Sequence, residues 1–115
     1  MKPRSAGAGA RRPGAAGELR VIGGEWRGRK IRFPPVPAIR PTPDRVRETV
    51  FNWLQPVIAG SRCLDLYAGS GALGLEALSR GAAQVVFVDV EAAVTRHLAA
   101  TLDALACSRG QVVRV

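Results

Sequence analysis

The chain has 115 residues, which allows one small domain at most. Its net charge of +8 favours a polyanionic partner such as nucleic acid, and no apolar run approaches the length of a membrane span. We therefore expect a cytoplasmic protein with no membrane contact. The two cysteines, Cys63 and Cys107, lie far apart without metal-ligand spacing, which predicts reduced thiols and no metal.

The positive charge is concentrated at the front of the chain. Residues 1–47 contain twelve Lys and Arg against three acids, whereas residues 48–115 contain five Arg against six acids. Residues 1–17 are rich in Gly, Ala, Arg and Pro without periodicity, which predicts a disordered basic tail.

Residues 18–33 are predicted to form a β-hairpin that contacts RNA. Leu19 and Val21 precede a Gly23-Gly24 turn signal, and Ile31 and Phe33 alternate with basic residues on the returning strand. Cations can meet phosphates and an indole can stack on a base. The candidate RNA contacts here are Trp26, Arg27, Arg29, Lys30 and Arg32. A solvated hairpin with Trp26 packed on the domain is the alternative.

A proline-rich linker, residues 34–43, leads into a predicted helix over Pro43–Leu54. Thr42 is a suitable N-cap, with Pro43 at the first helical position. The apolar stripe of this helix is predicted to be Val46, Val50, Phe51 and Leu54, with Trp53 beside it, and Pro56 to mark its exit.

The next stretch predicts a strand, a glycine-rich turn and a helix. Residues 63–67 form a short apolar run, the turn spans Gly69 to Gly74, and the helix over residues 73–79 ends near Gly81. Residues 84–88 predict a second strand ending in Asp89, which is followed by a helix over 91–106 and a third strand over 111–115. The single histidine, His97, is expected to be structural.

This order predicts an α/β fold: the first three parallel strands of a Rossmann-like sheet, preceded by the hairpin. Residues 34–115 would be the N-terminal half of a cofactor-binding domain. Because the third strand runs to the last residue, we expect the C-terminal half to be missing.

The glycine spacing fits two ligands that differ in charge. A dinucleotide brings a pyrophosphate, which Asp65, four residues before Gly69, would repel. S-adenosyl-L-methionine brings a sulfonium and an ammonium, which Asp65 would attract. Asp89 lies twenty residues after Gly69, where an acid can accept hydrogen bonds from ribose hydroxyls. We therefore favour the methyl donor over a nucleotide (NAD)-dependent oxidoreductase fragment. A non-catalytic RNA-binding module is the third reading.

Three segments together resemble the RsmD family of bacterial 16S ribosomal RNA guanine-N2 methyltransferases. They are V-I-G-G-E-W-R-G-R-K-I (21–31), R-P-T-P-D-R-V-R-E-T-V-F-N-W-L (40–54) and L-D-L-Y-A-G-S-G-A-L-G-L-E-A-L-S-R-G-A (64–82). The resemblance implies a class I methyltransferase fold and transfer of a methyl group to the exocyclic N2 of a guanine in 16S rRNA. It implies the rRNA or the small ribosomal subunit as partner, and we expect a monomer.

The resemblance also implies roles for matching positions. The cofactor site would comprise Asp65, Ala68, Gly69, Ser70, Gly71, Asp89, Glu91, Thr42 and Arg47, and Arg40 would join the RNA contacts. Arg47 could instead pair with Asp44 or Glu48 within its own helix. The family's catalytic motif, an acid or Asn followed by Pro-Pro and an aromatic residue, does not occur in these residues. We therefore name no catalytic residue and expect this chain to be inactive by itself.

Overall fold

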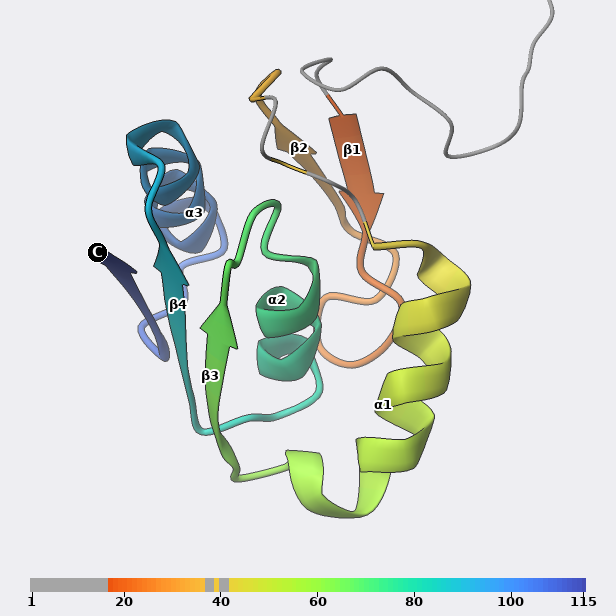
Figure 1. Ribbon diagram of the computed structural model, residues 1–115. Coiled ribbons are helices and arrows are strands. Elements are labelled where there is room, and N and C mark those ends of the chain that lie inside the picture. The colour runs from red at the N-terminus through yellow and green to blue at the C-terminus, as the bar shows by residue number, and fades with distance from the viewer. Residues whose placement is uncertain (1–16, 37–38, 40–41) are drawn as a thin grey trace, which may run out of the picture.

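The computed structural model describes residues 17–36, 39 and 42–115 (Figure 1). Residues 1–16 of the predicted tail and Arg40 lie outside this part of the chain, whereas Gly17, the last residue of that tail, begins a strand. Strands β1 (Gly17–Arg20) and β2 (Lys30–Phe33) form an antiparallel hairpin. Strands β3 (Arg62–Leu66), β4 (Gln84–Asp89) and β5 (Gly110–Arg114) form a parallel sheet in the order β3-β4-β5. The helices are α1 (Asp44–Ile58), α2 (Ala72–Ser79) and α3 (Ala92–Ala104). The α/β fold with a hairpin and three parallel strands is confirmed.

One face of the parallel sheet is covered by α2 and α3. Phe87 is fully buried at the centre of this face, where it lies in register with Asp65 and Val112. A Cβ on Gly74 of α2 would lie 2.3 Å from the Phe87 ring, and one on Gly110 would lie 2.7 Å from Leu102 of α3. Right-handed crossovers place successive helices on the same face of a parallel sheet. Because β3 and β4 are parallel neighbours, their carboxyl ends lie at the same edge of the sheet, beside the glycine-rich turn.

Helix α1 differs from its predicted bounds and orientation. It begins at Asp44 after Pro43, which is the N-cap, no side chain caps it, and it continues through Pro56 to Ile58. Its buried residues are Arg47, Phe51 and Ile58, whereas Val46 of the predicted stripe and Trp53 beside it are 48% and 76% exposed. The predicted stripe was therefore wrong in part. The helix turns Arg47 inward because a buried carboxylate on α2 receives it, as described below.

The hairpin shares its core with the α/β part of the molecule. Leu19 lies opposite Ile31 in the β1–β2 register, and these two and Phe33 are buried in the same hydrophobic cluster as Phe51 and Leu75. The intervening loop, residues 21–29, is closed by hydrogen bonds from the N–H of Val21 to the carbonyl of Arg29 and from Gly28 to Val21. This loop rests against α2, so the hairpin is held close to the helix that follows the glycine-rich turn.

Gly24 and Gly28 in this loop form a matched pair for testing that contact. Both have a φ of +81°, which costs any other residue about 1 kcal/mol. A Cβ on Gly24 would lie 2.0 Å from the carbonyl oxygen of Ser79, whereas one on Gly28 would meet nothing within 4 Å. We expect Gly24→Ala to lower the free energy of unfolding by about 1–3 kcal/mol more than Gly28→Ala, as measured by urea denaturation. Equal losses for the two variants would contradict the loop-to-α2 contact.

Candidate functional site

The bend begins at Tyr67, two residues before the predicted start of the glycine-rich turn at Gly69. Strand β3 ends at Leu66, and Tyr67 adopts a left-handed conformation with a φ of 56°. Gly69 and Gly71 also have positive φ values, of 56° and 85°. Gly71 is the N-cap of α2, where a Cβ would lie 2.6 Å from Leu98. Gly71 must be a glycine because a side chain there would clash with α3. Gly69 is favoured because the bend requires a left-handed backbone at that position.

Asp65 lies half-buried on β3 directly beneath this turn. Its Oδ2 accepts a hydrogen bond from the backbone N–H of Gly74 in the first turn of α2, at 3.1 Å. Burial raises the pKa of Asp65 to about 6; the Gly74 hydrogen bond opposes this rise, and the charge of Asp89 adds to it. A carboxylate that is costly to ionise here would be stabilised by a cationic ligand.

Asp89 connects the end of β4 to the glycine-rich turn. Its Oδ2 accepts a hydrogen bond from the N–H of Gly69 at 3.1 Å, and its Oδ1 accepts one from the N–H of Glu91 at 3.0 Å. Asp89 is 8% exposed. Each carboxylate oxygen can accept more than one hydrogen bond, so the two backbone contacts orient the group without saturating it.

The turn encloses a cavity of about 210 Å³ at the carboxyl end of β3. Five of the predicted cofactor residues line it: Thr42, Asp65, Ala68, Gly69 and Ser70. Sequence reasoning did not single out the others, which are Leu66, Tyr67, Ala72 and Leu73. These four residues belong to an apolar strand end and a helix start. Apart from being close to the glycines in the sequence, they carry no pattern that would predict a place in a binding site.

The remaining predicted cofactor residues lie outside the cavity lining. Gly71 is the N-cap of α2, and Asp89 accepts the hydrogen bond from the N–H of Gly69 within the turn. Glu91 is exposed at the N-cap of α3, with no capping hydrogen bond from its side chain. Thr42 lines the cavity but is not the helix cap that its sequence position predicts, since Pro43 occupies that position.

Arg47 pairs with Asp44 of its own helix, which is the alternative that the sequence left open. It is fully buried, and its Nη2 donates to Oδ1 of Asp44 while its Nη1 donates to the Arg20 carbonyl at 2.8 Å. The same Nη1 lies 3.2 Å from Oε1 of Glu76. Its Nε also donates to the carbonyl of Thr42, which lines the cavity, at 3.4 Å. The guanidinium is therefore held by four protein groups, and the clamp on a ligand carboxylate stays a prediction. The sequence pattern placed Arg47 outside the apolar stripe and so on the surface.

Glu76 is the centre of this buried network and was missed by sequence reasoning. It is 1% exposed on α2, yet its two oxygens accept four hydrogen bonds from three segments of the chain. The donors are the N–H of Ile22 at 3.0 Å, the N–H of Gly23 at 2.9 Å, Nη1 of Arg47 at 3.2 Å and Nε of Arg80 at 2.8 Å. A buried carboxylate needs such compensation. Glu76 therefore joins the hairpin loop and α1 to the helix that follows the turn.

Ser79, one helical turn after Glu76, holds the same loop. Its Oγ accepts a hydrogen bond from the N–H of Trp26 at 2.9 Å and donates to the Gly23 carbonyl at 2.6 Å. Trp26 is only 7% exposed, and Arg109 lies over its ring at 6.0 Å. The predicted stacking of Trp26 on a base is corrected, because the indole is packed against the domain.

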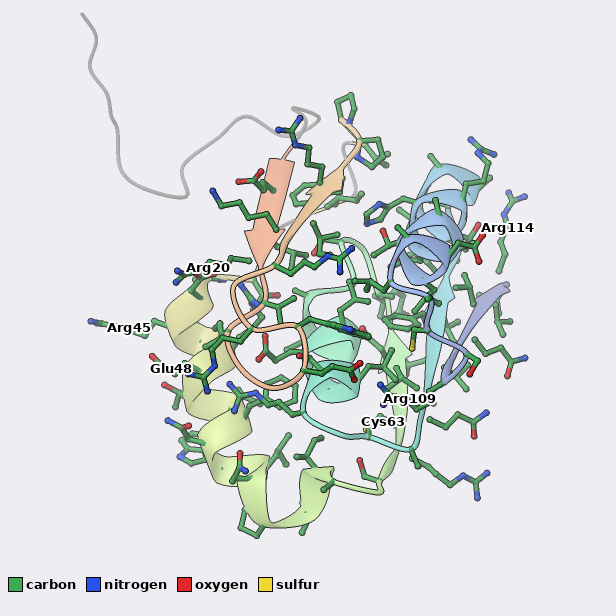
Figure 2. All side chains as sticks on the ribbon, turned by 180° about the vertical axis from the view of Figure 1, so that it is seen from behind. Arg20, Arg45, Glu48, Cys63, Arg109 and Arg114 are labelled. Atoms are coloured by element: carbon green, nitrogen blue, oxygen red, sulfur yellow. The ribbon has the colours of Figure 1, made fainter. Side chains whose placement is uncertain are left out.

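The basic side chains of the hairpin that were predicted to contact RNA lie at the surface. Arg27, Arg29, Lys30 and Arg32 are exposed, and the last three line a cavity of about 260 Å³ beside α3. Arg27 lines a second cavity, of about 360 Å³, between the hairpin loop and α1. Figure 2 shows Arg20 and Arg45 on the same side of the molecule, at β1 and α1, with Glu48 nearby. Arg20 and Arg45 were not among the predicted RNA contacts.

His97 supports the glycine-rich turn from α3. It is 9% exposed, and its Nε2 lies 3.1 Å from the carbonyl oxygen of Ser70. Burial lowers the pKa of His97, and the contact with the Ser70 carbonyl opposes that effect. A structural role agrees with the expectation from sequence. Within the residues that the structure describes, no three His, Cys, Asp or Glu cluster as metal ligands do, and no helix is long and apolar enough to span a bilayer.

Known proteins share both the sequence and the fold of this chain. Ribosomal RNA small subunit methyltransferase D of Escherichia coli is 54% identical over 98 residues, which are 85% of this chain and 50% of that protein. The solved structure of yhhF from Escherichia coli is 52% identical with a TM-score of 0.80, over 86% of this chain and 54% of its own. The C-terminal domain of precorrin-6Y C5,15-methyltransferase from Rhodobacter capsulatus, at 21% identity and a TM-score of 0.59, shares the fold over 66% of this chain and 41% of its own.

The chain thus spans about half the length of the curated relatives it matches. A family model described as Conserved hypothetical protein 95 matches residues 19–115, which include the hairpin from Leu19 onward, the glycine-rich turn and the strands β3, β4 and β5. The chain therefore belongs to this family, the RsmD family that its sequence resembles.

Proposed function

We propose that this chain supplies the S-adenosyl-L-methionine site and the RNA-facing hairpin of a methyltransferase acting on small-subunit ribosomal RNA. The observation that carries the proposal is the half-buried carboxylate of Asp65 in the cavity beneath the glycine-rich turn. Burial raises the pKa of Asp65 to about 6, and the nearby charge of Asp89 adds to the rise; a sulfonium or ammonium would stabilise the ionised carboxylate.

The same electrostatics disfavour a dinucleotide. A pyrophosphate placed at the turn would lie near two carboxylates, Asp65 and Asp89, and the N–H of Gly69 that could bind it already donates to Asp89. Two like unit charges about 4 Å apart repel each other by about 4 kcal/mol at an effective dielectric constant of about 20. The oxidoreductase reading is therefore the weaker one.

The RNA part of the proposal depends on the exposed cations of the hairpin and α1. Phosphate neutralisation by Lys and Arg releases counterions, so RNA affinity should fall steeply with salt. The name of the Escherichia coli relative supports small-subunit rRNA as the substrate class. The exocyclic N2 of a guanine in 16S rRNA is the acceptor that the RsmD resemblance implies, and we retain it as part of the proposal.

Titration calorimetry on the chain tests the ligand. We expect saturable binding of S-adenosylhomocysteine at pH 7.5 and none of NAD at the same concentration. Binding of NAD alone would support the oxidoreductase reading. Binding of neither ligand, together with salt-dependent binding of a 16S rRNA fragment, would support an RNA-binding module without a cofactor.

A further inference from the structure

The cavity between the hairpin loop and α1 contains polar side chains that the proposed function has not used. Its volume is about 360 Å³, and ligand pockets typically measure about 300–1,000 Å³. The loop lines it with Ile22, Gly23 and Gly24, and α1 lines it from the other side. Figure 2 shows Glu48 of α1 beside this loop. None of its lining residues belongs to the cavity at the glycine-rich turn, so it is a separate candidate site.

Helix α1 contributes three hydrogen-bonding side chains to this cavity. Glu48, Asn52 and Gln55 line it, and their spacing of four and three residues places them on one face of the helix. All three are exposed, and their side chains make no hydrogen bond or ion pair with any residue that the structure describes. Arg27 of the hairpin loop also lines the cavity and is exposed. One carboxylate, two amides and a cation thus surround the same space, ready to bind a ligand with both donors and acceptors.

Arg80 adds a mostly buried guanidinium to the lining. Its side chain is only 12% exposed, its Nε donates to Oε2 of Glu76 at 2.8 Å, and its guanidinium lies 5.4 Å from the centre of the Phe51 ring. Its two Nη atoms donate to no protein group within the described part of the chain. A Cβ on Gly23 would lie 3.0 Å from Nη2, so the glycine leaves room for this group. A buried donor without a partner is costly, and a ligand acceptor in the cavity would satisfy it.

These groups match the hydrogen-bonding pattern of guanine. The Watson–Crick edge of guanine carries two neighbouring donors, N1–H and the N2 amine, and one carboxylate such as that of Glu48 can accept both. Its O6 and N7 accept from a guanidinium, which is the commonest specific contact between arginine and a base. Adenine, cytosine and uracil have no two neighbouring donor atoms on that edge. A free phosphate would be repelled by Glu48, so the carboxylate favours a base over an inorganic anion.

We propose that this cavity binds one unpaired guanine nucleotide of the RNA substrate, other than the nucleotide that is methylated. The inference rests on the proposed function, since it takes RNA as the substrate. Sequence-specific proteins bind unpaired RNA bases because their Watson–Crick edges are free. Arg80 follows Ala72, which lines the cofactor cavity, by eight residues along α2, or about 12 Å. A guanine beside Arg80 is therefore distant from the methyl donor, and the cavity selects and positions the RNA.

Binding of short single-stranded RNAs to the chain tests the guanine preference. The probes are two labelled oligouridines, one with a single central guanine and the other with a single central adenine. We expect the guanine probe to bind about tenfold more tightly in fluorescence anisotropy, as a good bidentate base contact allows. Guanosine monophosphate should displace it more effectively than adenosine monophosphate. Binding of guanosine monophosphate without binding of the guanine probe would assign the cavity to a free nucleotide and overturn the proposal.

Glu48→Gln separates recognition of guanine from general attraction to RNA. Removing a negative charge favours contact with phosphates, so without a base contact the variant should bind both probes slightly more tightly. We expect instead that the guanine probe binds more weakly and that its preference over adenine disappears, because one amide oxygen cannot replace two carboxylate oxygens. Asp103→Asn makes the equivalent change of charge at an exposed position of α3 and should keep the preference. An unchanged preference in Glu48→Gln would contradict the assigned site.

Side-chain amide resonances locate the bound base. The chain has four amide side chains: Asn52 and Gln55 in the cavity lining, and Gln84 and Gln111 on the parallel sheet. The guanine probe should shift the amide signals of the first pair in isotope-labelled chain and leave the second pair in place. Salt-dependent binding of both probes with equal affinity would overturn this site and leave the proposed RNA-facing hairpin standing. Binding of neither probe would contradict both proposals.

Discussion

Glu76→Gln is expected to lower the free energy of unfolding by about 3–5 kcal/mol, the largest effect of any single substitution considered for this chain. Removing one partner of a buried ion pair leaves an uncompensated charge, which costs more than the pair contributed. Arg47 is fully buried and would lose its charged partner on α2, and the glutamine amide would turn a donor toward some of the four existing donors. Such a loss is a large fraction of the stability of a small domain.

Urea denaturation of the variant and of a matched control measures this effect. Glu48→Gln makes the same chemical change at an exposed position of α1, and should shift the free energy of unfolding by less than about 0.5 kcal/mol. A shift of that small size for Glu76→Gln would show that the network does not hold the hairpin loop to α2.

A double-mutant cycle separates the charge from the loss of contacts. Arg47→Met removes the buried guanidinium, so the combination of Arg47→Met and Glu76→Gln should cost less than the sum of the single changes. Coupling energies of about 0.5–3 kcal/mol are typical for residues within one network. Strict additivity would contradict a direct pairing of the two side chains across α1 and α2.

Asp65→Asn is expected to stabilise the chain at pH 7.5 while weakening its ligand binding. The pKa of Asp65 is raised to about 6 from its ordinary value of 3.8, so the folded chain holds a proton that the unfolded chain has released. Stability therefore falls as the pH rises from about 4 to about 6, and the penalty is complete above that range. The full shift corresponds to about 3 kcal/mol; because Asp65 is only half-buried, solvent screening reduces the expected gain to about 1–2 kcal/mol.

Binding should move in the opposite direction. A carboxylate paired with a ligand cation contributes about 1.5–3 kcal/mol, so Asp65→Asn should weaken S-adenosylhomocysteine binding about tenfold to a hundredfold at pH 7.5. At pH 5 the ligand-free chain holds Asp65 mostly protonated, so the difference in affinity between the two chains should shrink several-fold. Calorimetry and urea denaturation at both pH values measure the two effects.

Burial lowers the pKa of His97, but His97 is present in both chains, so its own titration cancels from their difference. Asp103→Asn, at an exposed position of α3, is the control and should change neither quantity. Loss of binding by Asp65→Asn that is equal at pH 5 and pH 7.5 would argue that the carboxylate acts through its shape rather than its charge.

The sequence predicted the site more completely than the packing around it. Strand, glycine turn and helix were recognisable because positive φ values and apolar runs have local signatures, and five of the nine predicted cofactor residues line one cavity. Arg47 and Trp26 were predicted to face a ligand and RNA. From the sequence alone, a charged residue beside an apolar stripe and a tryptophan next to basic residues both appear solvent-exposed. Their burial depends on partners at Glu76 and Arg109, which lie 29 and 83 residues away.

The sequence by itself determined the order of strands and helices, the left-handed glycine turn, the acid at position 65 and the basic character of the hairpin, because each arises from residues within a few positions of one another. Only the tertiary structure decided which face of α1 is buried, that one carboxylate on α2 holds the hairpin loop and α1 together, and which face of the sheet α2 and α3 cover. The reason is that burying a charge requires partners from distant segments, and the chain brings those together only when it folds.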